Sequence, residues 1–300
     1  MGDLLKKNKI LNDKSPQIFI ILPTFNRSKI TNIFADCLLE QKFKNYHLIL
    51  VDDGSTDDTV KSIKGKLKNI TVIVGDGNLW WAGAVQKGIN WLRLNIKDLS
   101  KIVLIANDDI SFDENYLENA MKIMKKKSIN LVSSYKNNKK INPFFCLNDK
   151  NGKFISENQK NYNPNCFAMN AVFFKLSFLM DIGNFHVRVL PHYLADIEFS
   201  YRAIKKGYKF IQDESVKVKW NMDSTGIHEI ENLKFFKFVK VVFSKKYSSN
   251  PISWTFFYFY TVKKRYVLKV ITYYWLKFII KFTYKFITSV LKYLFLKNKN

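Results

Sequence analysis

The stretch HLILVDDGSTDDT, from His47 to Thr59, joins a short apolar run to a turn that is rich in aspartate. The run HLILV is uncharged and largely aliphatic, which is typical of a strand that is buried on both faces. The DDGS that follows it consists of residue types that commonly end strands and form turns. The sequence here predicts a buried strand with acidic side chains at its carboxyl end.

Three further apolar runs have the same character and also end in turn residues. They are Gln17–Leu22, Ile70–Val74 and Lys101–Ala106. Stretches of helical length alternate with the four runs, and they are Ser28–Gln41, Asp57–Lys66, Ala82–Leu94 and Asp113–Lys127. Such alternation is typical of a mainly parallel central sheet that is covered by helices on both faces. We therefore expect an α/β fold.

Polar side chains follow three of the four predicted strands. They are Asp52-Asp53, Asp76 to Asn78, and Asn107-Asp108-Asp109. Ligands of such sheets bind at the carboxyl ends of the strands. Neighbouring carboxylates repel each other unless a cation lies between them, so a divalent metal such as Mg²⁺ or Mn²⁺ is expected here. The alternative is that these residues simply form turns.

Composition and absent motifs exclude several protein classes. The 300 residues are 47% hydrophobic and 25% charged, which is typical of a folded chain rather than a disordered one. The three cysteines form no C-x-x-C pair and H-E-x-x-H does not occur, which excludes a disulfide scaffold and that class of zinc hydrolase. No P-loop is present, and no G-x-G-x-x-G follows the first predicted strand. A bound diphosphate would then need a metal, which favours a nucleotide-sugar over a dinucleotide.

Five sequence blocks occur in order between Gln17 and Gln212. They are ILPTFNR from Ile21, VDDGSTDDT from Val51, GDGNLWWAGA from Gly75, NDDI from Asn107 and PHYLADIEFSYRAIKKGY from Pro191. Together they resemble the family-2 glycosyltransferases with the GT-A fold, and especially their bacterial rhamnosyltransferase-like branch. The resemblance implies a fold of GT-A type and metal-dependent hexosyl or deoxyhexosyl transfer from a nucleoside-diphosphate-sugar.

The resemblance also implies which residues bind the donor. They are Pro23, Thr24, Phe25, Asp53, Asn78, Trp80, Asn107 and Asp108, with Asp109 as the ligand of a divalent metal, Mn²⁺ or Mg²⁺. Phe25 stands where the family often has tyrosine, so a stacking face remains but a hydroxyl is lost. Asn107 replaces the first aspartate of a D-x-D-like element, so one fewer charge faces the diphosphate. For Trp80 and its neighbour Trp81, a packed aromatic pair at the start of a helix is the alternative.

The catalytic base is expected in a helix that runs to Lys206. Glu198 stands four residues before Arg202, in the order that favours an ion pair, so that arginine is its expected partner. The resemblance aligns Asp196 with the aspartate that takes the proton from the acceptor hydroxyl, which implies an inverting reaction. The alternative role for Asp196 is a helix cap or a first-turn acid.

Two histidines are weaker candidates for the same site. His192 could orient the acceptor, although a packed or solvated loop histidine is the simpler interpretation. His228 could be a further metal ligand, because some relatives place a histidine after the base, but the surrounding KWNMDSTGIH departs from their pattern.

The C-terminal part of the chain has a different chemistry. Residues 232–300 contain fourteen lysines, one arginine and no acidic residue, within a net charge of +24 for the whole chain. Lys277, Lys281, Lys285 and Lys292 fall on one face of a helix, with apolar and aromatic residues around the rest. This pattern predicts an amphipathic helical region on an anionic membrane surface. The alternative is a helix that packs on the catalytic domain with a solvated lysine face.

These observations divide the chain into three parts. We expect a polar N-terminal segment at residues 1–15, a GT-A glycosyltransferase domain at 16–231 and the basic aromatic helical region at 232–300. The first segment lacks the apolar region of a secretory signal, and no uncharged run of twenty residues is present in the last. We therefore expect a peripheral protein at the cytoplasmic face of the cell membrane, with a saccharide or lipid-linked acceptor.

Three other functions compete with this interpretation. A nucleic-acid-binding protein would explain the net charge, but the charge avoids the α/β part and no recognised RNA-binding motif occurs, so no nucleic acid is expected. A nucleotidyltransferase would usually have a glycine-rich loop after the first strand, and LPTFNRSK has no glycine. An inactive glycosyltransferase-like membrane scaffold is the third, and the presence of Asp109 and Asp196 argues against it.

Overall fold

The structure is a computed structural model, and its described residues are 16–126, 131–136, 144–160, 162–220, 235–245 and 247–297. The predicted N-terminal segment 1–15 and His228 lie outside these residues. All four predicted strands and the predicted helices between them are present, with ends that differ by a few residues.

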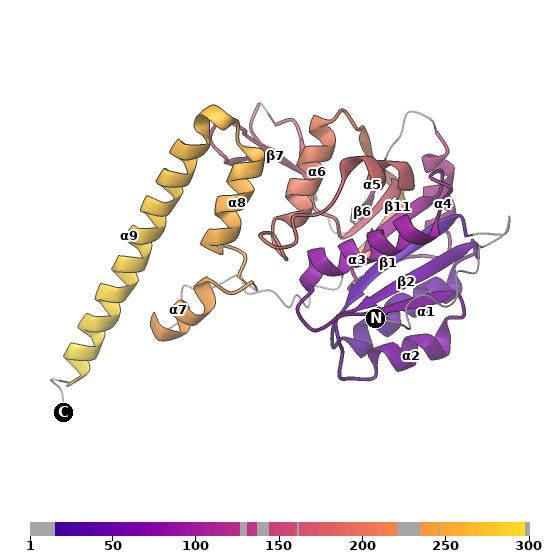
Figure 1. Ribbon diagram of the computed structural model, residues 1–300, viewed down its shortest axis with the longest axis horizontal. Helices are drawn as coiled ribbons and strands as arrows, with labels where there is room; N and C mark the ends of the chain where they lie inside the picture. The colour runs from indigo at the N-terminus through magenta and orange to yellow at the C-terminus, as the bar shows by residue number, and fades with distance from the viewer. Residues whose placement is uncertain are drawn as a thin grey trace.

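Within the described residues, the central sheet has eight strands in the order β3-β2-β1-β4-β10-β6-β11-β5. The paired strands β1 and β2 lie side by side in Figure 1. The bounds of the eight strands are β1 Ile18–Thr24, β2 Tyr46–Asp52, β3 Ile70–Val74, β4 Ile102–Ala106, β5 Ile110–Ser111, β6 Leu131–Lys136, β10 Ala171–Lys175 and β11 Phe210–Trp220. The first four are mutually parallel, β10 is antiparallel to both β4 and β6, and β11 is parallel to β6. The mainly parallel sheet is therefore confirmed. A smaller sheet has the order β8-β7-β9, with bounds Phe154–Ile155, Phe144–Leu147 and Cys166–Phe167.

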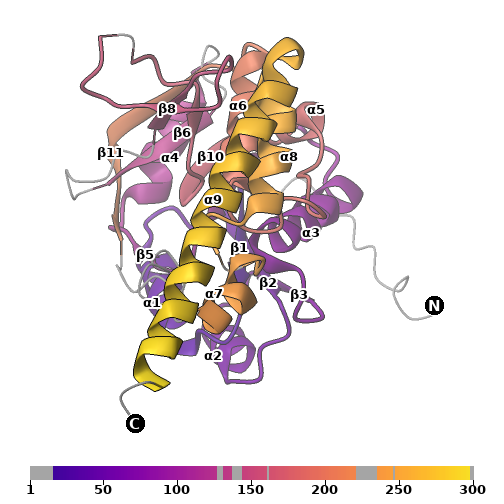
Figure 2. The same ribbon diagram turned by 90° about the vertical axis from the view of Figure 1, so that its left-hand side faces the viewer.

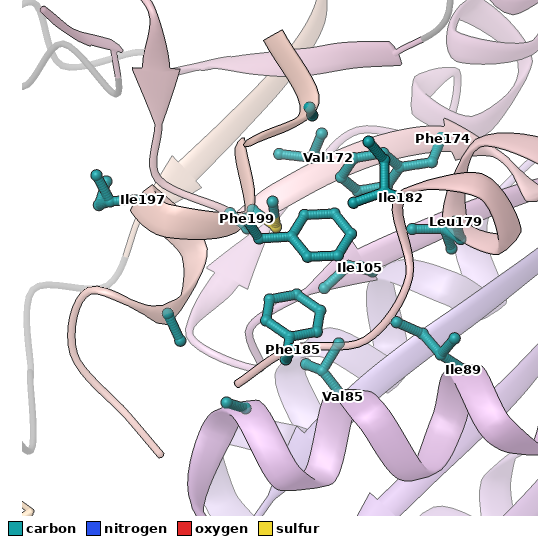
Figure 3. Close-up of a cluster of buried hydrophobic side chains, with 14 of the residues drawn as sticks. Val85, Ile89, Ile105, Val172, Phe174, Leu179, Ile182, Phe185, Ile197 and Phe199 are labelled. Carbon is teal, nitrogen blue, oxygen red and sulfur yellow. The ribbon is translucent and has the colours of Figure 1, made fainter. Parts of the chain in front are cut away.

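Helices cover both faces of the central sheet. They are α1 Ser28–Glu40, α2 Thr59–Lys66, α3 Trp80–Asn95, α4 Tyr116–Met124, α5 Leu176–Ile182 and α6 Ala195–Lys205. Alternate side chains of β1 point to opposite faces, so Phe19 and Ile21 pack with α3, α5 and α6, whereas Ile18 and Ile20 pack with α1, α2 and α4. Figure 3 shows part of the first cluster, in which Phe185 lies between Val85 of α3 and Phe199 of α6. Because these strands are buried on both faces of the sheet, their sequences are continuous apolar runs.

In the part of the chain that the structure describes, three helices follow β11: α7 Phe235–Val242, α8 Pro251–Thr261 and α9 Lys264–Lys297. Helix α8 packs between α6 and α9 (Figure 1), and the side chain of its Phe257 is fully buried in the core that α6 also lines. The ring of Tyr260 stacks on His186 at a centroid distance of 3.8 Å. Part of the basic C-terminal region is thus built into the core of the α/β unit.

Helix α9 lies along the outside of the molecule, in front of α8 when that side faces the viewer (Figure 2). Its apolar side chains occur on the side that packs against α7 and α8 and also on the exposed side. The predicted lysine face is only partly solvated, because Lys277 and Lys281 are exposed whereas Lys285 is half-buried with its Nζ 4.8 Å from the ring centroid of Phe238. No helix in the described part of the chain is long and apolar enough to cross a membrane.

Candidate active site

A cavity of about 260 Å³ opens where the strands β1 and β2 end and α3 begins. Its lining consists of Pro23, Thr24, Phe25, Arg27, Asp53, Gly77, Trp80, Trp81, Ala84 and His192. The structure therefore brings together most of the predicted nucleotide-sugar residues, from segments far apart in the sequence. Asn78 is exposed on the loop before α3 and does not line the cavity. Asn107, Asp108 and Asp109 follow the end of β4 and lie next to the cavity.

Asp53 shapes the loop that closes one side of the cavity. Its Oδ1 accepts hydrogen bonds from the backbone N–H groups of Gly77 and Leu79 at 3.0 and 3.1 Å, and its Oδ2 accepts one from Trp80 at 3.1 Å. A Cβ atom on Gly75 would lie only 2.4 Å from Asp53 Oδ1, so only glycine fits there. The predicted contact of Asp53 with the base or ribose stays a prediction, and holding this loop is a role that sequence reasoning missed.

The two tryptophans begin α3 and both line the cavity. The indole Nε1–H of Trp81 donates to Asn107 Oδ1 at 2.8 Å, which ties α3 to the end of β4. The ring of Trp80 lies 6.0 Å from that of His192 and 5.6 Å from Lys245 Nζ, which comes from the segment after α7. The tryptophans are therefore both helix-start residues and cavity walls. The predicted contact of Trp80 with the donor stays a prediction.

Arg27 forms the charged wall of the cavity beside the predicted metal site. Its Nη1 lies 2.7 Å from Asp108 Oδ1, and its Nη2 lies 3.6 Å from Asp109 Oδ2. Asp108 is buried, and its Oδ2 also accepts hydrogen bonds from Thr24 and Thr31. Burial raises the pKa of Asp108 to about 6, while the guanidinium of Arg27 acts in the opposite direction. Asp108 therefore holds Arg27 in place, a role that its position in a D-x-D-like element does not reveal.

The residues around Asp109 fit a metal ion that is completed by a substrate. Asp109 Oδ1 is buried, and no hydrogen-bond partner reaches it within the described part of the chain. Among the same residues, no group of three or more His, Cys, Asp or Glu side chains could hold a metal by itself. Mg²⁺ is commonly bound by one or two carboxylates together with substrate phosphates. The arrangement is suited to a cation that arrives with a phosphorylated ligand.

Residues Met169 and Asn170 connect the donor side of the site to Asp196. The backbone N–H of Asn107 donates to the carbonyl of Asn170 at 2.8 Å, and the Asn107 Nδ2 amide donates to Asn170 Oδ1 at 3.3 Å. The backbone N–H of Met169 donates to Asp196 Oδ2 at 3.2 Å. The end of β4 and the start of α6 are therefore held by two consecutive residues, which sequence reasoning did not single out.

Asp196 is the second residue of α6 and is partly exposed. The cap residue of this helix is Leu194, whose side chain makes no capping hydrogen bond, so Asp196 is a first-turn acid rather than the cap.

Three non-glycine residues of the described chain have left-handed φ, and all border the site: Asn26 at 52°, Trp80 at 57° and Leu194 at 68°. Such conformations cost of order 1–3 kcal/mol each and cluster at functional sites.

Glu198 is paired with Arg202, as the four-residue spacing predicted. Arg202 Nε and Nη2 donate to the two carboxylate oxygens of Glu198 at 3.0 and 2.9 Å, and Glu198 is buried. The same guanidinium donates to the carbonyls of Ile182 and Asn184. This bidentate pair anchors α6, and hence Asp196, against the segment that follows α5.

Replacing Arg202 by methionine should lower the free energy of unfolding by about 3 kcal/mol, because Glu198 would be left buried without its charge partner. The measurement is urea denaturation followed by circular dichroism. Lys206→Met is the matched control, since Lys206 pairs with Asp181 at the surface and should contribute less than about 1 kcal/mol. Equal losses for the two variants would contradict the structural role of the pair.

Comparison with known proteins places this site in a family. A sequence model of glycosyl transferase family 2 matches residues 19–179, which is more than half of the chain. The chain belongs to glycosyl transferase family 2. The match includes the end of β1, Asp53, the two tryptophans and the Asn107–Asp109 element, whereas Asp196 lies beyond it.

Curated relatives of this family-2 chain match over shorter stretches. The amylovoran biosynthesis glycosyltransferase AmsB of Erwinia amylovora is 33% identical over 76 residues, which are 24% of this chain and 25% of AmsB. An uncharacterized glycosyltransferase of Rickettsia felis is 27% identical over 126 residues, which are 41% of this chain and 20% of that protein. The matches thus span a quarter or less of the length of these relatives.

Two solved structures share the fold. The mannosyltransferase PcManGT from Pyrobaculum calidifontis, in complex with GDP-Man and Mn²⁺, has a TM-score of 0.53 and 18% identity, covering 83% of this chain and 72% of that one. A structure of residues 1–349 of S. aureus TarS has a TM-score of 0.51 and 17% identity, covering 68% and 60%. This likeness confirms the predicted GT-A type of α/β fold. The rhamnosyltransferase-like branch stays a prediction.

Proposed function

We propose that this glycosyltransferase is an inverting enzyme that moves a hexose or deoxyhexose from a nucleoside-diphosphate-sugar to a hydroxyl group of a saccharide or lipid-linked acceptor. The observation that carries the proposal is the bridge formed by Met169 and Asn170. It holds Asp196, the proposed base, and Asn107, beside the proposed metal ligand, on one rigid scaffold. A transfer reaction needs both groups at fixed positions around one substrate.

The donor side supplies positive charge to a leaving diphosphate. Arg27 lines the cavity, and its buried Nε–H makes no hydrogen bond within the described residues, so it is a spare donor for a phosphate oxygen. Asp109 would hold the divalent metal, Mn²⁺ or Mg²⁺. When bound, such a metal neutralises the negative charge that develops on the leaving group. Phe25 and Trp80 offer aromatic faces for the base of the nucleotide.

The acceptor side supplies a base. In the proposed reaction, Asp196 takes the proton of an acceptor hydroxyl while that oxygen attacks the anomeric carbon from the face opposite the nucleotide. The bond from this carbon to the diphosphate oxygen breaks, and the anomeric configuration inverts. His192 lines the cavity between Trp80 and Tyr193 and is placed to position a sugar hydroxyl. Glu198 forms the bidentate ion pair with Arg202, and in this proposal it takes no part in proton transfer.

The cellular role that we propose is the synthesis of a bacterial surface polysaccharide at the cytoplasmic face of the cell membrane. AmsB, one of the relatives, carries the name of a polysaccharide pathway. The acid-free region 232–300 favours an anionic membrane surface as a partner. Lys245 of this region reaches the ring of Trp80, so the region lies beside the donor cavity and a lipid-linked acceptor could approach it there.

The test of the donor proposal is a thermal-shift panel of dTDP-, UDP- and GDP-linked sugars, each with and without Mn²⁺ or Mg²⁺. One nucleotide class should raise the melting temperature only when metal is present, because Asp109 needs the phosphates to complete the metal site. No stabilisation of the folded protein by any of these donors would instead support the alternative, an inactive glycosyltransferase-like membrane scaffold.

A further inference from the structure

The exposed side of α9 carries an unusual concentration of large apolar side chains. Between Tyr273 and Leu291, nine of them are exposed by 39–69% of their surface: Tyr273, Leu276, Ile279, Ile280, Tyr284, Phe286, Ile287, Val290 and Leu291. We call these nine residues the outer face of α9. Contiguous exposed apolar surface of this extent marks an interaction site in a folded protein.

The outer face is distinct from the side of α9 that packs on the protein. The packed side contacts Tyr258 of α8 through Tyr274, and it contacts α7 and the residues just after it through Phe278 and Phe282. At 100° per residue, the outer face from Tyr273 to Leu291 fills an arc of about 160° and is about 27 Å long. No charged residue interrupts this arc, and Lys277 and Lys281 lie at its border.

The charge around the outer face determines which partner fits it. Residues 232–300 contain fifteen basic residues and no acidic residue, so a second copy of α9 would bring like charges together without any acid to pair with them. The apolar arc is also wider than the narrow seam of a coiled coil. An anionic bilayer satisfies both features, since its interior accepts the apolar side chains and its headgroups accept the lysines.

We propose that the outer face of α9 inserts into the interface of an anionic lipid bilayer, with the helix lying in the membrane plane and Lys277 and Lys281 at the headgroups. This inference specifies how the protein contacts the membrane that the proposed function names as a partner, and it rests on that part of the proposed function alone. In this arrangement the apolar side chains make the main contact with the membrane, and the lysines set the preference for negative lipids. Tyr273 and Tyr284 at the rim fit the polar boundary of the bilayer.

The test is flotation of the full chain with vesicles of phosphatidylcholine alone or with added phosphatidylglycerol, at physiological salt. The wild-type protein should bind the anionic vesicles at least tenfold more strongly than the neutral ones. Ile280→Glu combined with Ile287→Glu should weaken binding to anionic vesicles by at least tenfold. Lys277→Gln combined with Lys281→Gln should leave part of the binding and reduce the preference for anionic lipid.

A matched control is Leu94→Glu, because Leu94 is an apolar residue that is 84% exposed on α3, outside the C-terminal region. It should bind vesicles as the wild type does. Unchanged vesicle binding by the Ile280→Glu, Ile287→Glu variant would overturn the proposal. A stable dimer that ignores vesicles and dissociates on the same substitutions, measured by sedimentation velocity, would also overturn it. Because this assay does not measure sugar transfer, a result that overturns the membrane proposal would leave the transferase proposal unaffected.

Discussion

Asp196→Asn is expected to lower turnover by about 10²–10⁴-fold, the contribution of a general base, while donor affinity stays within about twofold. The side chain lies in the first turn of α6, where its Oδ2 accepts a hydrogen bond from the backbone N–H of Met169. Asparagine has the same shape and keeps an oxygen that can accept this bond. The substitution therefore removes the proton acceptor and leaves the scaffold in place.

The measurement is the rate of sugar transfer at saturating donor, with donor affinity determined by calorimetry on the same samples. Asp181→Asn is a suitable control, because Asp181 is an exposed carboxylate on α5 that pairs with Lys206. It should leave the rate unchanged. A nearly normal rate for Asp196→Asn would remove Asp196 from the mechanism and would direct attention to another acid near His192.

Asp109→Asn should abolish the metal-dependent part of donor binding and reduce turnover by about 10²-fold or more, since a metal at a leaving diphosphate stabilises the transition state by several kcal/mol. Asp109 has a buried oxygen without a hydrogen-bond partner in the described chain, and Arg27 approaches the other oxygen to only 3.6 Å. An amide is a poorer ligand than a carboxylate for a hard divalent cation, so the substitution removes the proposed protein ligand of the metal.

The measurement is a titration with Mn²⁺ in the presence of the donor that the thermal-shift panel identifies. Asp76→Asn is the matched control, because Asp76 is an exposed carboxylate that also follows a strand but only caps its own turn. The control should keep the metal response of the wild type. The same metal-dependent stabilisation in Asp109→Asn would show that the cation binds elsewhere.

Much of the fold could be predicted because a buried strand or helix face requires apolar residues at recognisable positions in the sequence. A strand that is covered on both faces must be apolar along its length, so β1, β2, β3 and β4 are visible as uninterrupted runs. The antiparallel strand β10 was not predicted, because its AVFFK is too short to be distinguished from a buried helix segment. The Glu198–Arg202 pair was predictable, since both residues belong to one helix turn.

The site was predictable as a set of residues but not as an arrangement. The family pattern identified Pro23, Phe25 and Trp80, and all three line the cavity. Arg27 belongs to the block ILPTFNR, but the family resemblance implies no role for it, although a positive charge beside a predicted diphosphate could have indicated one. Asn170 gave no signal, because nothing in its neighbourhood in the sequence shows that β10 places it against Asn107.

The alternation of strands and helices, the acidic strand ends and the acid-free C-terminal region can all be recognised in the sequence, because each depends on residues that are neighbours in the chain. Other features appear once the chain is folded: Asp108 holds Arg27, Asp53 holds the loop before Trp80, and α9 turns an apolar face outward. These features depend on the register of the sheet and on which side of a helix its neighbours cover. The sheet register and the covered side of a helix both depend on packing among segments far apart in the sequence, so neither can be predicted from local sequence patterns.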